Sequence, residues 1–255
     1  MNRLSLIKVG GKIVEGHDSL RYLLQDFASL NGYKLLVHGG GRSATELAAK
    51  LGVESRMVNG RRVTDADMLQ IVTMVYGGLV NKNIVAGLQA LNVNALGLTG
   101  ADLNLIRSRR RAVKDVDYGL VGDVEEVDAA ALGELVRKNI VPVVAPITHD
   151  CAGQLLNTNA DTVAGELARA LAGSFDVELV FCFEKKGVLL DEADDESVIR
   201  ELDRRTFADY VERGIIQGGM IPKLENAFAA IDAGVKRVVI TRASELLTSN
   251  GTVIQ

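Results

Sequence analysis

The sequence is poor in cysteine and proline and carries no excess of basic charge, and each shortage excludes a class of protein. Its 255 residues include 2 cysteines, which lack metal-ligand spacing and are too few for a disulfide-stabilised scaffold. With 3 prolines and no low-complexity segment, nothing marks a flexible linker between independent domains. A formal net charge of -4 does not suit a general nucleic-acid binder. We therefore expect a single domain, residues 1–255, with no nucleic-acid partner.

Long hydrophobic runs are also missing. No apolar run approaches the roughly 20 residues that a membrane-spanning helix needs. The first residues enter a predicted strand too early to contain a signal peptide. Because 47% of the residues are hydrophobic, the chain has enough apolar material for a substantial core. The sequence predicts a soluble, unprocessed, cytoplasmic protein with no membrane partner.

What is present is a series of short apolar runs rich in valine, isoleucine and leucine, which are typical of buried strands. They cover residues 4–9, 33–37, 95–98, 140–144, 177–182 and 237–240. Helical patterns alternate with them. Residues 18–30 stop at Asn31-Gly32, and Ser43 with Glu46 predicts a capping box before the next helix. This alternation predicts an α/β fold with a mainly parallel sheet covered by helices.

Two segments depart from the alternation. Residues 56–64 are predicted to form a hairpin, because Asn59-Gly60 is the dipeptide that a two-residue type I′ turn prefers. Residues 65–91 form a long helical pattern that is expected to break at Gly77-Gly78. Its apolar side belongs either to the core, which is the default, or to a face for a second subunit.

Glycines follow the first two predicted strands. Lys8 lies near the end of the first strand, before Gly10-Gly11, and Gly39-Gly40-Gly41 follow the second strand. Glycine lets the backbone approach a ligand and turn its N–H groups toward phosphate oxygens. Either loop alone is more often a simple turn, but the carboxyl ends of neighbouring parallel strands define one crevice. Neither loop has Walker A or dinucleotide-fold spacing, and together they indicate a phosphate-binding site.

Two later segments carry polar groups at predicted helix starts. Asn157 to Asp161 offer two amides and a carboxylate, for which plain N-capping is the simplest interpretation. Lys223 follows Pro222 near the positive end of another helix, an odd location for a cation unless an anion binds there. The alternative for Lys223 is an ordinary solvated lysine.

Two charged runs and the histidines are interpreted as structural or surface features. Arg107 to Arg111 has no aromatic neighbour, so a solvated hairpin is a better interpretation than an RNA site. Asp191 to Glu196 is interpreted as a surface loop. We expect His38 to anchor the second glycine loop, and His17 and His149 to lie in loops.

Five motifs, taken in order, resemble those of the amino acid kinase family, and in particular its branch that phosphorylates N-acyl-glutamates. They are Lys8-Val9-Gly10-Gly11, His38-Gly39-Gly40-Gly41, Gly60-Arg61-Arg62-Val63-Thr64, Asn157-Thr158-Asn159-Ala160-Asp161 and Gly219-Met220-Ile221-Pro222-Lys223. The resemblance implies transfer of a phosphoryl group from ATP to the γ-carboxylate of N-acetyl-L-glutamate, or of a close N-acyl-glutamate such as the N-succinyl form. The products would be an acyl phosphate and ADP, in the second step of arginine biosynthesis.

The resemblance also implies an open sheet sandwiched by helices, with an N-terminal lobe, residues 1–174, for the acyl amino acid and dimerisation, and a C-terminal lobe, residues 175–255, for ATP. It makes Lys8 and Lys223 the catalytic cations on the transferring group, oriented by Asp161. The substrate-binding residues that it implies are Gly40, Gly41, Arg62, Asn157 and Asn159. The ATP-binding residues that it implies are Gly10, Gly11, Glu184, Lys185, Lys186, Gly187, Val188, Leu189, Ile215, Ile216 and Gln217.

Chemistry and resemblance agree on what the reaction needs. Phosphoryl transfer requires alignment and positive charge, and a carboxylate acceptor is already ionised at neutral pH, so no general base is needed. The resemblance implies ATP as co-substrate and Mg²⁺ bound through its phosphates, with no metal ligand set of the protein's own. A start almost directly at the first strand, without the extra helix of the arginine-inhibited hexamers, implies a homodimer without arginine feedback.

Other interpretations remain open beside this one. Other members of the family act on carbamate, aspartate, glutamate or uridylate, and a catalytically silent nucleotide-binding regulatory subunit would share the glycine loops. The joint presence of Lys8, Asp161 and Lys223 favours an enzyme. One departure is Phe183-Glu184-Lys185, where most relatives have Thr-Asp-Val, which implies different contacts to the nucleotide.

Overall fold

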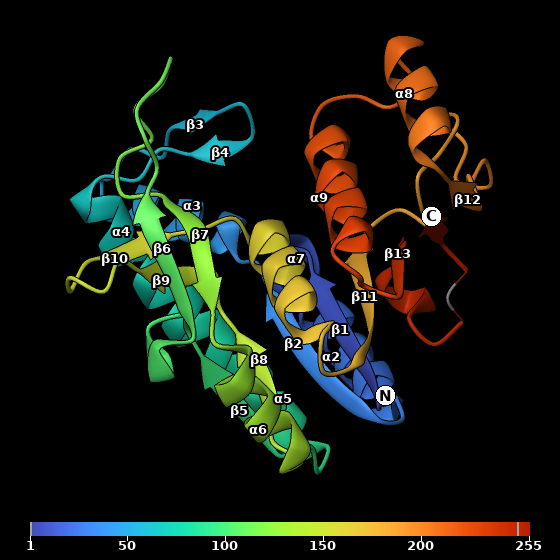
Figure 1. The fold of residues 1–255 in the computed structure, drawn as a ribbon. Helices are drawn as coiled ribbons and strands as arrows, with labels where there is room; N and C mark the ends of the chain where they lie inside the picture. The colour runs from blue at the N-terminus through green and yellow to red at the C-terminus, as the bar shows by residue number, and fades with distance from the viewer. Residues whose placement is uncertain (1, 249) are drawn as a thin grey trace.

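The computed structural model describes residues 2–248 and 250–255, and its main feature is a sheet with helices on both faces (Figure 1). In the described residues this sheet has 8 strands in the order β12-β14-β13-β11-β1-β2-β8-β5. The neighbours from β13 to β5 are all parallel, and β14 is antiparallel to β13. The strands of this sheet are β1 Arg3–Val9, β2 Tyr33–His38, β5 Ala95–Leu98, β8 Val141–Val144, β11 Asp176–Phe183, β12 Glu201–Leu202, β13 Arg237–Arg242 and β14 Thr252–Ile254.

Helices connect most of these strands and cover the sheet. The α-helices are α1 Gly11–Glu15, α2 His17–Ser29, α3 Gly41–Lys50, α4 Ala66–Val72, α5 Asn81–Ala90, α6 Ala129–Arg137, α7 Ala160–Leu171, α8 Arg204–Glu212 and α9 Met220–Asp232. A π-helical segment, η1 Thr73–Val80, joins α4 to α5, and two short 3₁₀ turns are η2 Asp102–Asn104 and η3 Ala243–Glu245. Figure 1 shows α7 and α9 side by side on one face of the sheet, where they pack against each other.

The six apolar runs of the sequence are the six adjacent strands from β13 to β5, so the prediction of a mainly parallel α/β fold is confirmed. Strands covered on both faces are apolar throughout, which is why the runs are nearly continuous. In β1, Leu4 and Leu6 join the core under α7 and α9, whereas Ile7 and Val9 join the core under α2 and α5. Because side chains alternate along a strand, Lys8 points to the face that α7 covers.

Two smaller sheets lie beside the main one. A 4-stranded sheet has the order β10-β9-β6-β7, with β6 Ile106–Arg110, β7 Gly122–Val127, β9 Ile147–His149 and β10 Leu155–Asn157. The predicted hairpin is confirmed as β3 Met57–Val58 and β4 Arg61–Arg62. Its turn residues Asn59 and Gly60 have φ values of 48° and 72°, as a type I′ turn requires. Figure 1 shows this hairpin beside the protruding tip of the β6–β7 hairpin.

The capping box predicted at Ser43 is wrong. The helix α3 begins at Gly41, so Ser43 already lies in its first turn. The cap comes from the end of α1, where Glu15 Oε1 accepts a hydrogen bond from the backbone N–H of Ser43 at 2.8 Å. A carboxylate at a helix N-terminus is favoured by the unpaired N–H groups there. Glu15 therefore connects the helix after the first glycine loop to the helix after the second.

The helix break expected at Gly77-Gly78 is also wrong, because both glycines lie inside η1 and the helical path continues. The combined helix, Ala66–Ala90, has 25 residues and a window of mean hydropathy 1.3, so by length and composition it is able to cross a membrane. The expectation that no apolar run approaches this length is thereby corrected. Of that window, 44% is buried inside the protein, and a core helix passes the same test.

Candidate active site

Two charged side chains meet at the carboxyl end of β1. Lys8 points toward α7, and its Nζ lies 2.7 Å from Asp161 Oδ1. Asp161 is in the first turn of α7, which Asn159 caps by accepting hydrogen bonds from the backbone N–H groups of Asp161 and Thr162. The N-capping interpretation of this segment is therefore confirmed for Asn159. The cap also fixes the backbone from which the Asp161 carboxylate projects.

Lys223 completes the cluster from α9. Its Nζ lies 3.0 Å from Asp161 Oδ2, so one carboxylate contacts both ammonium groups. The Lys223 ammonium also lies 5.4 Å from the ring centroid of Phe181 and 5.7 Å from that of Phe183, within range of cation–π attraction. The Lys8 and Lys223 side chains are only 10% and 13% exposed. Two ammonium groups and one carboxylate leave this buried cluster with a net positive charge.

The electrostatics of the cluster follow from its burial. Burial alone would raise the pKa of Asp161, but the charges of Lys8 and Lys223 and their hydrogen bonds lower that pKa to about 2. Burial and the charge of Lys8 lower the pKa of Lys223, against the opposing effects of Asp161 and Glu184. Strongly shifted pKa values in a cleft are typical of functional sites.

The two glycine loops face each other beside this cluster. The backbone N–H of Gly10 donates to the Cys182 carbonyl at 3.1 Å, and that of Gly39 donates to the Val9 carbonyl at 3.1 Å. These bonds hold the loops to the ends of the neighbouring strands. A Cβ at Gly11 would lie 3.5 Å from the backbone nitrogens of both Gly40 and Gly41. Glycine at position 11 thus leaves the space in front of the second loop open.

His38 anchors the second glycine loop, as expected. Its Nδ1–H donates to the Gly39 carbonyl at 2.8 Å, and its Nε2 accepts from Asn81 Nδ2 at 3.1 Å. The imidazole is fully buried, and burial lowers its pKa to about 4, so it is neutral at physiological pH. The expectation of loop positions is wrong for the other two histidines, since His17 begins α2 and His149 ends β9.

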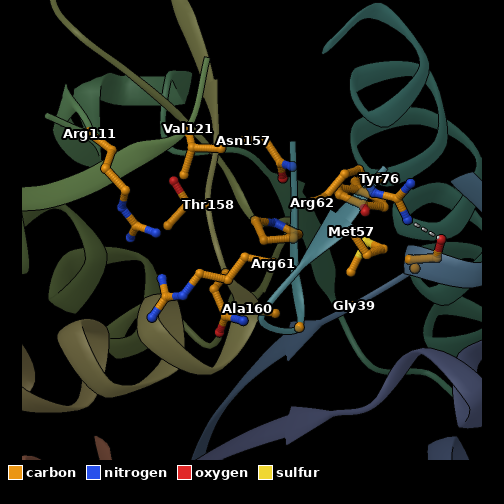
Figure 2. Close-up of a pocket in the computed structure, with 15 residues that line it drawn as sticks. Gly39, Met57, Arg61, Arg62, Tyr76, Arg111, Val121, Asn157, Thr158 and Ala160 are labelled. Atoms are coloured by element: carbon orange, nitrogen blue, oxygen red, sulfur yellow. Dashed lines mark hydrogen bonds between the residues drawn. The ribbon is translucent and has the colours of Figure 1, made fainter. Parts of the chain in front are cut away.

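A cavity of about 190 Å³ opens beside the second glycine loop (Figure 2). All five residues assigned to substrate binding from the sequence line it, namely Gly40, Gly41, Arg62, Asn157 and Asn159. The other lining residues are Gly39, Met57, Gly60, Arg61, Tyr76, Arg111, Val121, Pro146, Thr158 and Ala160. This lining includes three arginines and no carboxylate among the described residues. The cavity therefore suits an anionic ligand.

Arg62 is a buried charge whose protein partners are neutral. Its Nη2 donates to the Gly41 carbonyl and to Thr45 Oγ1, both at 2.8 Å, and its Nη1 donates to Ser55 Oγ. Among the described residues, no carboxylate lies within ion-pair distance of the guanidinium. Asn157, which also lines the cavity, donates from Nδ2 to Thr64 Oγ1 at 3.0 Å. A buried cation without a counter-ion is costly unless an anion binds.

A second recess lies in the C-terminal part of the chain. Its volume is about 40 Å³, and its lining is Lys185, Gly187, Val188, Leu189, Glu192, Ile215, Ile216, Gln217 and Met220. An adjoining hollow of about 450 Å³ shares Glu192, Ile215 and Gln217 with it. Seven of the residues assigned to ATP binding from the sequence are therefore together here. The other four, Gly10, Gly11, Glu184 and Lys186, do not line the recess. Glu184 lies 3.4 Å from Lys12 Nζ, and Lys186 pairs with Glu196.

The sequence interpretation assigned none of the ten other lining residues to the cavity, and three of them, Arg61, Arg111 and Tyr76, have large polar side chains. Arg61 directly precedes Arg62 on β4, and Arg62 was already assigned to the site. The position of Arg61 next to Arg62 in the same motif could therefore have indicated that it lines the cavity. Arg111 was assigned to a solvated hairpin; it ends that run, and its Nε donates to Asp123 Oδ1 at 2.9 Å. Tyr76 lies under the second glycine loop, because a Cβ at Gly40 would be 3.0 Å from Tyr76 Cδ1. No local pattern indicates the position of Tyr76.

Comparison with known proteins identifies relatives of the whole chain. The sequence profile of the "Amino acid kinase family" matches residues 3–242. An acetylglutamate kinase of Parabacteroides distasonis is 71% identical over 252 residues, which cover 99% of each chain. An acetylglutamate kinase of Phocaeicola vulgatus is 68% identical over 253 residues, covering 99% of this chain and 98% of the relative.

The fold comparison agrees with the sequence comparison. A solved structure of a Streptococcus mutans UA159 protein has a TM-score of 0.82 at 28% identity, covering 99% of this chain and 98% of the other. The matches extend over both the lysine cluster and the cavity. The chain belongs to the amino acid kinase family.

Proposed function

We propose that the enzyme transfers the γ-phosphoryl group of ATP to the γ-carboxylate of N-acetyl-L-glutamate or of a close N-acyl-L-glutamate. The products are an acyl phosphate and ADP, and the reaction is the second step of arginine biosynthesis. Relatives that are 66 to 71% identical over nearly the full chain carry the name acetylglutamate kinase, which supports this assignment. The lysine cluster and the cavity support the proposal, because both provide the positive charge that such a reaction needs.

The single observation that carries the proposal is the contact of Lys8 and Lys223 with the one carboxylate of Asp161. In the transfer, a carboxylate oxygen of the acceptor forms a bond to the γ-phosphorus while the bond from that phosphorus to the bridging oxygen breaks. Negative charge then accumulates on the equatorial and leaving oxygens. Two pre-positioned ammonium groups stabilise this charge more in the transition state than in the ground state.

No proton has to be removed from the acceptor, because its γ-carboxylate is ionised at neutral pH. This agrees with the state of His38, which is neutral, buried and occupied by Gly39 and Asn81. We propose that the backbone N–H groups of Gly40 and Gly41, at the start of α3, bind the reacting carboxylate. Alignment and charge are then the main contributions of the protein.

The rest of the acceptor would occupy the cavity of Figure 2. We assign the α-carboxylate to Arg62, whose buried guanidinium has only neutral protein partners. Asn157 and Asn159 line the same cavity and are assigned to the acylamino group. Planar guanidinium groups suit carboxylates because they donate two parallel hydrogen bonds.

ATP is assigned to the recess around Gly187 and Ile216, with its phosphates directed toward Gly11. On this assignment, residues 1–174 bind the acceptor and residues 175–255 bind the nucleotide. Among the described residues, no group of three or more His, Cys, Asp and Glu side chains is placed to hold a metal ion. We propose that Mg²⁺ is held by the ATP phosphates, where it would neutralise part of their charge.

We further propose a cytoplasmic homodimer without nucleic-acid or membrane partners. Met74 and Leu79 on η1 are 51% and 58% exposed, and a second copy of the chain would cover such apolar side chains. Light scattering after size-exclusion chromatography tests the homodimer. A monomer at micromolar protein concentration would overturn it.

The proposed activity is tested by incubating the protein with MgATP and N-acetyl-L-glutamate in hydroxylamine, which traps an acyl phosphate as a hydroxamate. We expect hydroxamate that requires ATP and disappears in the Lys8→Ala variant. Lys50→Ala is the matched control, because Lys50 is an exposed residue at the end of α3. No hydroxamate with any N-acyl-L-glutamate would replace this proposal with a catalytically silent nucleotide-binding subunit.

A further inference from the structure

The acceptor cavity contains more positive charge than N-acetyl-L-glutamate requires. That acceptor has two carboxylates. On the proposed function, the γ-carboxylate lies at the glycine loop beside the lysine cluster and the α-carboxylate lies against Arg62. The cavity lining nevertheless contains two more arginines, Arg61 and Arg111, and no described carboxylate. Their charges need a separate explanation.

Arg111 is already neutralised by the protein. Its Nε donates to Asp123 Oδ1 at 2.9 Å and its Nη2 to the same oxygen at 2.5 Å, and the guanidinium lies 5.6 Å from the ring centroid of Tyr118. Arg61 has no such partner, since none of the described carboxylates lies within ion-pair distance of it. Its charge therefore remains uncompensated in a partly buried position, in the lining of a cavity that also contains Arg62 and Arg111.

The hairpin directs Arg61 and Arg62 to different parts of the cavity. Successive residues of a strand point to opposite faces, and Figure 2 shows Arg62 beside Tyr76 while Arg61 extends toward the side occupied by Arg111. Arg61 and Arg111 also line an adjoining hollow of about 400 Å³, together with Lys114 and Tyr118. This second space shares Arg61 and Arg111 with the acceptor cavity, and its lining has four basic side chains, with Arg109 and Lys114, against the two carboxylates of Asp115 and Asp123.

We propose that the N-acyl group of the natural acceptor ends in a carboxylate and that Arg61 binds this third carboxylate. This inference rests on the proposed function, because it extends the same acceptor from its amide nitrogen toward the Arg61 side of the cavity. A four-carbon dicarboxylic acyl group, as in N-succinyl-L-glutamate, supplies the charge that Arg61 lacks. An acetyl group ends in a methyl and leaves Arg61 unpaired.

The test compares three acceptors in the hydroxamate assay: N-acetyl-, N-butanoyl- and N-succinyl-L-glutamate. The butanoyl group matches the succinyl group in chain length but is uncharged, so it separates length from charge. Hydrogen bonds to charged groups change affinity by about 10- to 100-fold. We expect kcat/KM for the succinyl acceptor to exceed the butanoyl value by at least about tenfold. In Arg61→Gln this ratio should fall to near one.

Arg56→Gln is the matched control, because Arg56 is exposed at the base of the same hairpin and does not line the cavity. A wild-type protein that uses the acetyl and succinyl acceptors equally well would overturn the inference and leave the proposed function intact. An equal loss on all three acceptors in Arg61→Gln would also overturn it, since Arg61 would then bind a group that all three share.

Calorimetry without ATP measures acceptor binding alone, so this second test does not depend on turnover. We expect the wild-type protein to bind N-succinyl-L-glutamate more tightly than N-butanoyl-L-glutamate and Arg61→Gln to bind both alike. Equal binding of the two by the wild-type protein would overturn the inference. If no acceptor yields hydroxamate but this difference in binding is present, the proposed reaction fails and the third-carboxylate site stands.

Discussion

Replacement of Asp161 by asparagine separates the electrostatic role of this residue from its shape. Asparagine has nearly the same volume but no charge, and it would leave the ammonium groups of Lys8 and Lys223 buried at the positions where Asp161 holds them 2.7 and 3.0 Å from its oxygens. Two buried cations would then repel each other without a counter-ion. We expect the variant to lose both stability and turnover.

The loss of stability follows from the burial of the cluster. Removing one partner of a buried ion pair costs about 3 to 5 kcal/mol, which in a protein of this size lowers Tm by roughly 6 to 20 °C. The native carboxylate contributes its own pH dependence. Because the charges of the two lysines lower the pKa of Asp161 from 3.8 to about 2, its contribution is complete above pH 3.8 and is lost as the pH falls through about 2. That contribution is on the order of 2 kcal/mol.

The loss of turnover comes from the same charge. Without Asp161 the lysines are no longer oriented, and we expect kcat to fall by at least about 100-fold, the usual effect of removing one group that stabilises transition-state charge. The carboxylate also raises the pKa of Lys223, which burial and Lys8 lower. In Asp161→Asn the Lys223 ammonium should therefore lose its proton at a lower pH. The alkaline limb of the kcat profile should move to lower pH.

These effects are measured by the hydroxamate assay from pH 6 to 10 and by thermal unfolding at pH 7. Asp209→Asn is the control, because Asp209 forms an exposed ion pair with Arg213 on α8 at 3.0 Å, and such pairs contribute little. A kcat within about threefold of wild type, with an unmoved alkaline limb, would refute the assignment of Asp161 as the orienting carboxylate.

Three further predictions concern neighbouring groups. Lys8→Ala and Lys223→Ala should each lower turnover by orders of magnitude while the ATP Kd, measured by calorimetry, changes only modestly; unchanged turnover would remove the lysine from the reaction. Because burial lowers the pKa of His38 from 6.5 to about 4, the free energy of unfolding should fall by on the order of 3 kcal/mol as the pH drops through this window. In His38→Gln, the free energy of unfolding measured by urea titration should depend less on pH. An unchanged pH dependence would mean that another group causes the effect. Gly40→Ala places a Cβ 3.0 Å from Tyr76, so the acceptor KM should rise, and an unaltered KM would exclude close packing there.

The strands could be predicted from the sequence because burial on both faces leaves a local signal. Four of the six residues 4–9 and five of the six residues 177–182 are apolar, and each run became a central strand whose bounds differ by at most one residue at either end. Helix starts were predicted less well. Ser43 has the local pattern of a cap, yet the cap of α3 is Glu15, 28 residues earlier in the chain. A cap supplied by another helix cannot be recognised from the residues around the helix start.

The site shows the same division between local and distant causes. Lys8 and Arg62 belong to short motifs whose spacing is visible in one stretch of chain. Arg61 and Arg111 carry equal charges, and only tertiary packing decides that Asp123 neutralises Arg111 and that no described carboxylate does so for Arg61. Tyr76 enters the cavity because a π-helical segment, not the expected break, follows α4. These features depend on contacts between elements that are far apart in sequence.

The position of the lysine cluster follows from the order of the strands. β1 and β11 are neighbours in the sheet, but the chain leaves β1 toward β2 on one side and leaves β11 toward β12 and β13 on the other, and such a switch point opens a crevice at the carboxyl edge of the sheet. Asp161 lies in the first turn of α7, where the helix dipole favours a carboxylate. Lys223 lies near the start of α9, where the dipole disfavours a cation, so Lys223 depends on Asp161 more than Lys8 does. The kinetic defect of Asp161→Asn should therefore resemble that of Lys223→Ala more closely than that of Lys8→Ala.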